Sequence, residues 1–240
     1  MEWEQRHPGD AAEWLSVLDR HGIGKAFLFG HANLTRSDLC KEDNDNLVRV
    51  ASRYSDRLFP VASAWPQMGE DGVAEVRRCI DELGVKGLKF HPWLQGFSTA
   101  DSVLQKMCGL AGDAGIPVFF HDGTPCYSLS EQIAGLARRV PHTQFVLAHS
   151  GLLWDWRSAL CANRLRNVWF CLCGPHRRAI ELICERADHE RIIWGSDFGF
   201  GSADQIEYRL NLLLRARIPG DLLRRILGEN PLQLFRWEKD

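Results

Sequence analysis

The sequence of 240 residues lacks any long apolar run. Its apolar stretches, such as QFVLA at 144–148 and PVFF at 117–120, fall far short of the roughly 20 residues that a membrane-spanning helix needs. The first ten residues, MEWEQRHPGD, contain no apolar core of the kind that a signal peptide carries. We therefore expect a soluble, cytoplasmic protein with no membrane partner.

The sequence also lacks an excess of either charge and lacks closely paired cysteines. Lys and Arg number 29 against 31 Asp and Glu, and the basic residues are scattered, so nucleic acid is not an expected partner. None of the eight cysteines forms a Cys-x-x-Cys pair, and Cys171 and Cys173 are too close in one expected strand for an ordinary disulfide. We expect reduced cysteines, mostly in the core.

Short apolar runs recur along the chain, and they are continuously apolar, which is typical of strands covered on both faces. Between them lie patterns with helical period, several of which start at an acidic or hydroxyl residue and end at glycine. This alternation predicts one α/β domain over residues 1–240, with a parallel sheet that is either a closed barrel or an open doubly wound sheet. The runs lie at 25–30, 58–65, 86–90, 117–120, 144–148, 168–173 and 191–196.

Histidines and one aspartate gather where the expected strands end. The carboxyl ends of parallel strands share one side of a sheet, so we expect these residues to collect on one face. Each of them alone could simply cap the next helix or stay solvated, but six together indicate a functional site. The residues are His31, His91, His121, His149, His176 and Asp197.

A lysine and several tryptophans fall near the same rim. Lys89 and His91 are two residues apart in GLKFHP, so they project from the same side of a strand. A lysine pointing inward is costly unless it meets an anion or a ligand, and the alternative, equally weighted, is that it extends to the rim. With Trp65 and Trp93 these residues predict a pocket for a small planar acid, whereas Trp156 is more typical of helix packing.

The motifs GLKFHP, FFHDGTP, LAHSG, WGSDFGFG and GENPLQLF resemble, in order and spacing, those of the amidohydrolase superfamily, specifically its amidohydrolase-2 branch. The resemblance implies a metal-dependent (β/α)8 TIM barrel, in which some members hydrolyse amides or lactones and others decarboxylate unsaturated or aromatic acids. It also implies that His121, His149 and Asp197 bind a divalent metal, with zinc as the expected ion, and that His149 and Asp197 are catalytic.

From this resemblance we expect a hydrolase that attacks a small amide, ester or lactone with a metal-activated water. Two alternatives stay open. One is a metal-dependent decarboxylase of an unsaturated or aromatic acid, and the other is a pseudoenzyme with a deficient metal site.

The sequence departs from the family at its start. The family's first strand ends in His-x-His, but this chain contains no such motif and no apolar run before residue 25. Strand 1 is therefore expected to be missing or truncated. Three explanations are open: the native protein begins upstream of Met1, the segment was lost, or another element fills the gap. We favour the first. A missing strand leaves unpaired edges, which a second copy of the chain could cover as a homo-oligomer.

Overall fold

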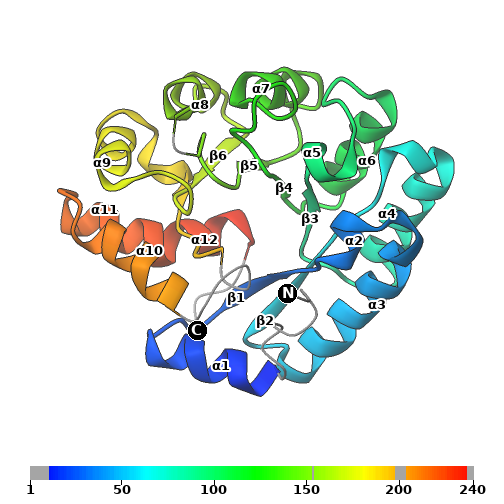
Figure 1. The fold of residues 1–240 in the computed structure, drawn as a ribbon, viewed down its shortest axis with the longest axis horizontal. Helices are drawn as coiled ribbons and strands as arrows, with labels where there is room; N and C mark the ends of the chain where they lie inside the picture. The colour runs from blue at the N-terminus through cyan, green and yellow to red at the C-terminus, as the bar shows by residue number, and fades with distance from the viewer. Residues whose placement is uncertain (1–10, 153, 198–203, 237–240) are drawn as a thin grey trace, which may run out of the picture.

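The computed structural model describes residues 11–152, 154–197 and 204–236. Its seven strands form one sheet in the order β1 to β7, and each strand pairs in parallel with the next one along the chain (Figure 1). Each strand lies within one of the apolar runs, so the predicted α/β class with a parallel sheet is confirmed. The strands are β1 (Ala26–Phe29), β2 (Leu58–Ala62), β3 (Gly87–Phe90), β4 (Val118–Phe120), β5 (Phe145–Leu147), β6 (Val168–Cys171) and β7 (Ile192–Ile193).

Helices connect the strands and surround the sheet (Figure 1). Within the described residues, none of them is long and apolar enough to cross a membrane. The helices are α1 (Ala11–Arg20), α2 (Ala32–Thr35), α3 (Cys40–Ala51), α4 (Glu70–Asp81), α5 (Pro92–Gln95), α6 (Ser102–Asp113), α7 (Ser130–Arg139), α8 (Trp156–Ala162), α9 (Arg177–Arg186), α10 (Asp204–Leu214), α11 (Gly220–Arg224) and α12 (Asn230–Leu234).

Helix α6 shows how local sequence sets these elements. The Asp101 carboxylate caps its start by accepting the backbone N–H groups of Val103 and Leu104. Its buried side chains recur at helical spacing, which turns one apolar stripe toward the sheet. They are Leu104, Met107, Cys108 and Ala111.

Side chains along each strand alternate between the two faces of the sheet. Residues such as Leu88, Phe90 and Phe120 pack against the helices in the larger core. Their neighbours, such as Val61 and Phe119, point to the inside of the curved sheet, where a smaller apolar cluster lies. The inside of the curved sheet is therefore a packed apolar core, as in other barrels.

The barrel is not closed within the described residues, because β1 and β7 are edges that do not pair with each other. The expectation that the last strand runs over 191–196 was wrong, since β7 holds only Ile192 and Ile193. Asp197 has a φ of 56°, in the left-handed region, which an extended strand cannot contain.

C-terminal side chains cover part of the opening between the two edges. The ring of Phe235, directly after α12, lies inside the curved sheet, 3.9 Å from the ring centre of Phe27 and 6.1 Å from that of Phe119. On the outer side, Ile206 of α10 packs in one cluster with Leu28 of β1. Among the described residues, aromatic and aliphatic packing thus partly fills the place between the two edge strands.

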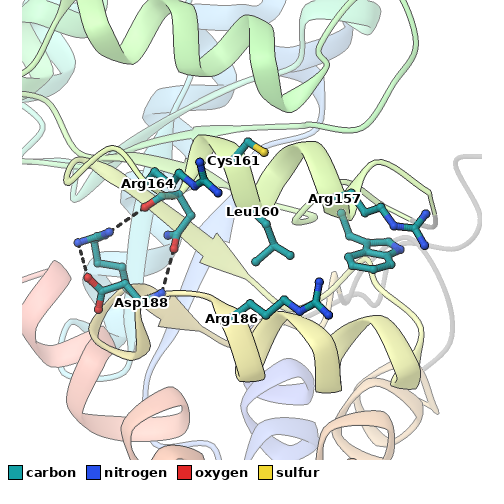
Figure 2. A pocket seen from close by; sticks show the side chains of 9 residues that line it. Arg157, Leu160, Cys161, Arg164, Arg186 and Asp188 are labelled. Carbon is teal, nitrogen blue, oxygen red and sulfur yellow. Dashed lines mark hydrogen bonds and ion pairs between the residues drawn. The ribbon is translucent and has the colours of Figure 1, made fainter.

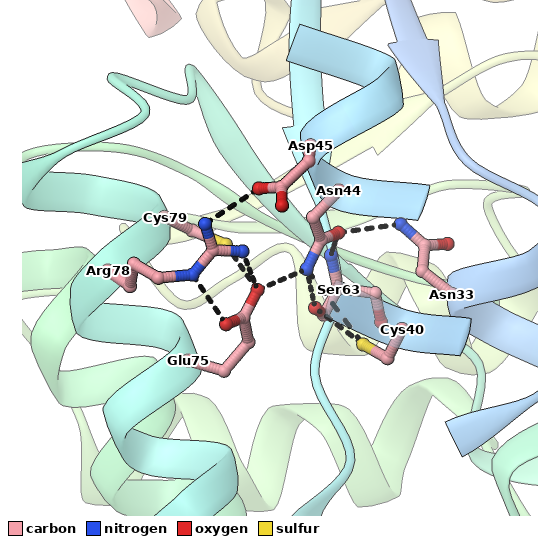
Figure 3. Close-up of polar contacts among 8 residues, drawn as sticks. All are labelled: Asn33, Cys40, Asn44, Asp45, Ser63, Glu75, Arg78 and Cys79. Atoms are coloured by element: carbon pink, nitrogen blue, oxygen red, sulfur yellow. Dashed lines mark hydrogen bonds and ion pairs between the residues drawn. The ribbon is translucent and has the colours of Figure 1, made fainter. Parts of the chain in front are cut away.

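A buried polar network holds the ends of β1 and β2 against α3 and α4, with Asn44 at its centre (Figure 3). The Asn44 amide donates to the Ser63 carbonyl and to Glu75 Oε1, both at 2.9 Å. Its Oδ1 accepts from Asn33 Nδ2 at 2.9 Å and from the Ser63 backbone N–H at 3.1 Å. Because Asn33 follows β1 and Ser63 follows β2, the network fixes the loops from which the site rises.

Candidate active site

Three of the six predicted residues bring their rings together at the carboxyl ends of β3, β4 and β5. The rings of His91 and His121 stack nearly parallel, with centres 3.8 Å apart and an interplanar angle of 13°. The His149 ring meets the His121 ring edge to face at 4.3 Å. The Nδ1 of His176 accepts the Ala179 N–H at 3.3 Å and so caps α9.

The local contacts of His91 fix its orientation. Its Nδ1 accepts the backbone N–H of Leu94 at 3.4 Å at the start of α5, so the ring hydrogen is assigned to Nε2. Its backbone N–H donates to Gln95 Oε1 at 2.8 Å, and the Gln95 amide in turn donates to the hydroxyl of Ser63. His91 therefore offers an Nε2–H donor while it also caps a helix.

Asp122 positions the loop that carries His149, and the sequence reading missed it. The carboxylate is fully buried and accepts the backbone N–H groups of His149 at 2.6 Å and of Gly151 at 2.5 Å. Gly151 has a φ of +86° and no room for a Cβ, which explains the glycine of the LAHSG motif. Burial raises the pKa of Asp122 to about 6, although these two hydrogen bonds oppose the rise.

Cys173 is a second neighbour of His149 that the sequence reading left in the core. Its thiol donates to the Ala148 carbonyl at 2.8 Å, and its sulfur lies 3.1 Å from His149 Nδ1. With the thiol hydrogen used on Ala148, the sulfur accepts the Nδ1–H and leaves the lone pair on Nε2. Gly174 permits this approach, since a Cβ there would lie 2.8 Å from the Cβ of His149.

The three imidazoles are electrically neutral at neutral pH. Burial, with a smaller contribution from Lys89, lowers the pKa of His91 to about 3 and that of His121 to about 2. The pKa of the fully buried His149 falls well below its usual value for the same reasons. The site thus presents uncharged rings beside cationic side chains.

Two cationic side chains flank these rings. Lys89 is buried in the inner face of β3, with Nζ 5.5 Å from the ring centre of Phe29. Burial lowers the pKa of Lys89, and the charge of the nearby Asp197 opposes the fall. Arg209 of α10 donates to the Gly174 carbonyl at 3.2 Å, and its buried Nε has no hydrogen-bond partner in the described structure. The sequence reading missed Arg209, because only the tertiary fold brings α10 to this end of the sheet.

The tryptophans divide as follows. Trp93 is 55% exposed and its ring centre lies 6.2 Å from that of His91, at the rim. Trp65 is half-buried, and its indole N–H donates to the Asn33 carbonyl at 2.8 Å, so it helps to hold the loop after β1. Trp156 is buried at the start of α8. Trp93 is therefore the member of the predicted set best placed to contact a ligand.

The described residues do not complete a metal site. Among them, no three His, Cys, Asp or Glu side chains are grouped so that they could hold one ion. The lone pairs of an imidazole lie in the ring plane, so those of the stacked His91 and His121 run side by side instead of meeting. Asp197 is exposed at the edge of the described structure. Its predicted place beside His121 and His149 as a metal ligand stays a prediction.

Comparison with known proteins identifies the family. The amidohydrolase family model matches residues 15–237, nearly the whole described chain. The chain belongs to the amidohydrolase family. The amidohydrolase-2 branch inferred from the motifs is thereby confirmed, and so is a TIM-barrel-like fold in an incomplete form.

Three similar proteins carry informative names. A 2-amino-3-carboxymuconate-6-semialdehyde decarboxylase of Dictyostelium discoideum is 22% identical over 204 residues, which cover 68% of this chain and 57% of that protein. The 5-carboxyvanillate decarboxylase of Sphingomonas paucimobilis is 17% identical, with a TM-score of 0.74 over 93% of this amidohydrolase and 82% of that chain. A dihydroxybenzoic acid decarboxylase of Polaromonas, solved with manganese and 2-nitroresorcinol, is 14% identical. Its TM-score is 0.75, over 96% of this chain and 87% of that one.

These comparisons correct the expected function. The hydrolase of amides, esters or lactones was the wrong leading hypothesis, because the relatives named above are decarboxylases. They match the alternative of a decarboxylase acting on an aromatic or unsaturated acid. At identities below 25% the solved structures show the fold alone, and the chain spans little more than half of the curated relative.

Proposed function

We propose that this amidohydrolase is a decarboxylase of a small aromatic or unsaturated carboxylic acid. The observation that carries the proposal is the buried cation of Lys89, which lies over the ring of Phe29 at the mouth where three neutral imidazoles gather. Burial of this ammonium is costly and is offset only in part by the charges of Asp197 and Asp122, so a substrate carboxylate would supply a further anion. The names of the relatives support the same chemistry.

The residues of the site divide the work of such a reaction. Lys89 and Arg209 bind and orient anionic oxygens of the substrate, and the exposed face of Phe29 contacts its planar part. The Nε2–H of His91 donates a further hydrogen bond. In the reaction a proton adds to the ring or vinyl carbon that bears the carboxylate. The bond from this carbon to the carboxylate carbon then breaks, and carbon dioxide leaves. Because the pKa of Lys89 is lowered, its ammonium is a stronger proton donor than an exposed lysine.

A divalent cation belongs to this proposal, because similar decarboxylases have been solved with manganese. His121 and His149 are the imidazoles, and Asp197 the carboxylate, that we propose as its ligands. The described residues do not bring these groups together around one ion, so the roles given to Lys89, Arg209 and His91 do not depend on the metal. Zinc, the ion expected from the sequence, has no support over manganese.

The test is release of labelled carbon dioxide from carboxyl-labelled hydroxybenzoates and carboxymuconate-type acids, each with added Mn²⁺, with added Zn²⁺ and after chelation. We expect turnover of at least one acid and a loss of about a hundredfold or more in Lys89→Met, because a buried charge that meets the substrate is removed. The matched control is Lys86→Met, which changes an exposed lysine just before the same strand. Absence of carbon dioxide from every acid under all three conditions would refute the proposal.

A further inference from the structure

A pocket of about 440 Å³ lies in the outer layer of the molecule, between α8 and α9 (Figure 2). Its walls include Asn163 and Arg191, which lie in the segments that lead into the amino ends of β6 and β7. The imidazoles sit at the opposite, carboxyl ends of the strands. This pocket therefore belongs to a different part of the fold from the candidate active site.

The walls of the pocket are rich in arginine. Arg157, Arg164 and Arg186 are exposed, and among the described residues no acidic side chain pairs with any of them. The acid that lines the pocket, Asp188, is neutralised by Arg191 at 2.7 Å. The pocket thus concentrates positive charge on a chain whose formal net charge is −2.

The base of the pocket is apolar and firmly held. Figure 2 shows the Leu160 side chain in the middle of the group, with the labelled arginines around it. Arg157 lies over the buried Trp156 ring at 4.6 Å, which holds its guanidinium in place. Arg191 donates to the Asn163 carbonyl at 2.8 Å, so the wall beneath the free guanidinium groups is tied together.

Guanidinium groups that line one hollow raise the positive potential inside it, which attracts anions. Guanidinium groups bind phosphate and carboxylate oxygens through paired N–H donors. The volume falls within the range of about 300–1,000 Å³ that is usual for small-molecule sites. We propose that this pocket binds a small organic anion that carries two or more phosphate or carboxylate groups on a compact apolar body.

Cys161 provides a reporter inside the pocket, because its exposed thiol is part of the lining. The experiment measures the rate at which iodoacetamide alkylates Cys161 and Cys126, resolved by peptide mass spectrometry on the full chain. Cys126 is also exposed but lies outside the pocket, so it is an internal control. The probes are pyrophosphate and citrate, which separate phosphate from carboxylate recognition, with sodium chloride at equal ionic strength.

We expect pyrophosphate or citrate to slow alkylation of Cys161 about tenfold at roughly ten times its dissociation constant, as simple occupancy requires, and to leave Cys126 unchanged. Arg164→Ala and Arg186→Ala should each remove this protection, measured against the same variant without anion. Arg138→Ala, which changes an exposed arginine on α7, should retain it. All three are surface changes, and thermal unfolding checks that each variant is folded.

Three results would overturn the proposal. Equal protection by sodium chloride would mean general screening of charge. Protection that survives in both Arg164→Ala and Arg186→Ala would place the anion elsewhere. Protection by a polyglutamate peptide but by neither small anion would assign the pocket to an acidic protein segment. None of these results depends on decarboxylase activity, so the two proposals fail separately.

Discussion

Replacement of Asn44 by alanine tests whether the buried polar network holds the loops beneath the site. The change removes five hydrogen bonds, one of them a weak bond to the Cys40 sulfur, and leaves the Asn33 amide and the Ser63 backbone N–H buried without a partner. Glu75 keeps its paired contacts with Arg78, both at 2.8 Å. Each unpaired buried donor costs about 1–3 kcal/mol, so with the small cavity we expect the free energy of unfolding to fall by about 4 kcal/mol.

Urea unfolding followed by tryptophan fluorescence measures this loss as a lower midpoint. The control is Asn46→Ala on the same helix, whose exposed side chain accepts one bond from Arg49, and it should change the free energy of unfolding by less than about 0.5 kcal/mol. Because Ser63 also contacts Gln95, which holds His91, the Asn44 variant should lose turnover as well. A loss of stability below about 1 kcal/mol would refute the assigned role of the network.

Further predictions concern the site and its pH dependence. Asp197→Asn should reduce turnover strongly and His176→Ala only mildly, and equal losses would mean that the centre is misplaced. Cys173→Ala should give a mixture of the two neutral tautomers of His149, observed by ¹⁵N NMR, whereas Cys173→Ser should keep the single tautomer with hydrogen on Nδ1. A His149 spectrum that is unchanged in Cys173→Ala would contradict the sulfur contact. Burial alone would raise the pKa of Glu75, but hydrogen bonds, first from Arg78, outweigh burial and hold the folded-state pKa below the ordinary 4.5. The carboxylate therefore stabilises the fold fully above pH 4.5, and this stabilisation disappears as the pH falls through the lower folded-state pKa. Glu75→Gln should remove this part of the pH dependence of the free energy of unfolding, measured by urea unfolding at several pH values.

The sequence alone was sufficient for the positions of the strands, apart from the end of β7, and for the gathering of three of the five predicted imidazoles. Continuous apolar runs mark buried parallel strands, and any residue that directly follows such a run lies at the same end of the sheet. This reasoning placed His91, His121 and His149 together, and it allowed for capping, which His176 and His91 both perform.

The remaining features depend on tertiary contacts that no local pattern specifies. Asp122 and Cys173 act on His149 across 27 and 24 residues of chain, and Arg209 reaches Gly174 across 35. The direction in which a ring points at a strand end is set by its hydrogen-bond partners, so the stacking of His91 on His121 was not foreseeable. The motif FFHDG offered one usable signal, since an acid next to a site histidine often orients a neighbouring loop.

The position of Phe235 has a consequence for how the protein is made. Its ring packs on Phe27, more than two hundred residues earlier in the chain, so the two meet only after the segment carrying α12 has left the ribosome. Until then the aromatic lining of the half-formed ring of strands faces water, where it invites self-association. A newly made chain that stalls before α12 would therefore need chaperones that shield this lining.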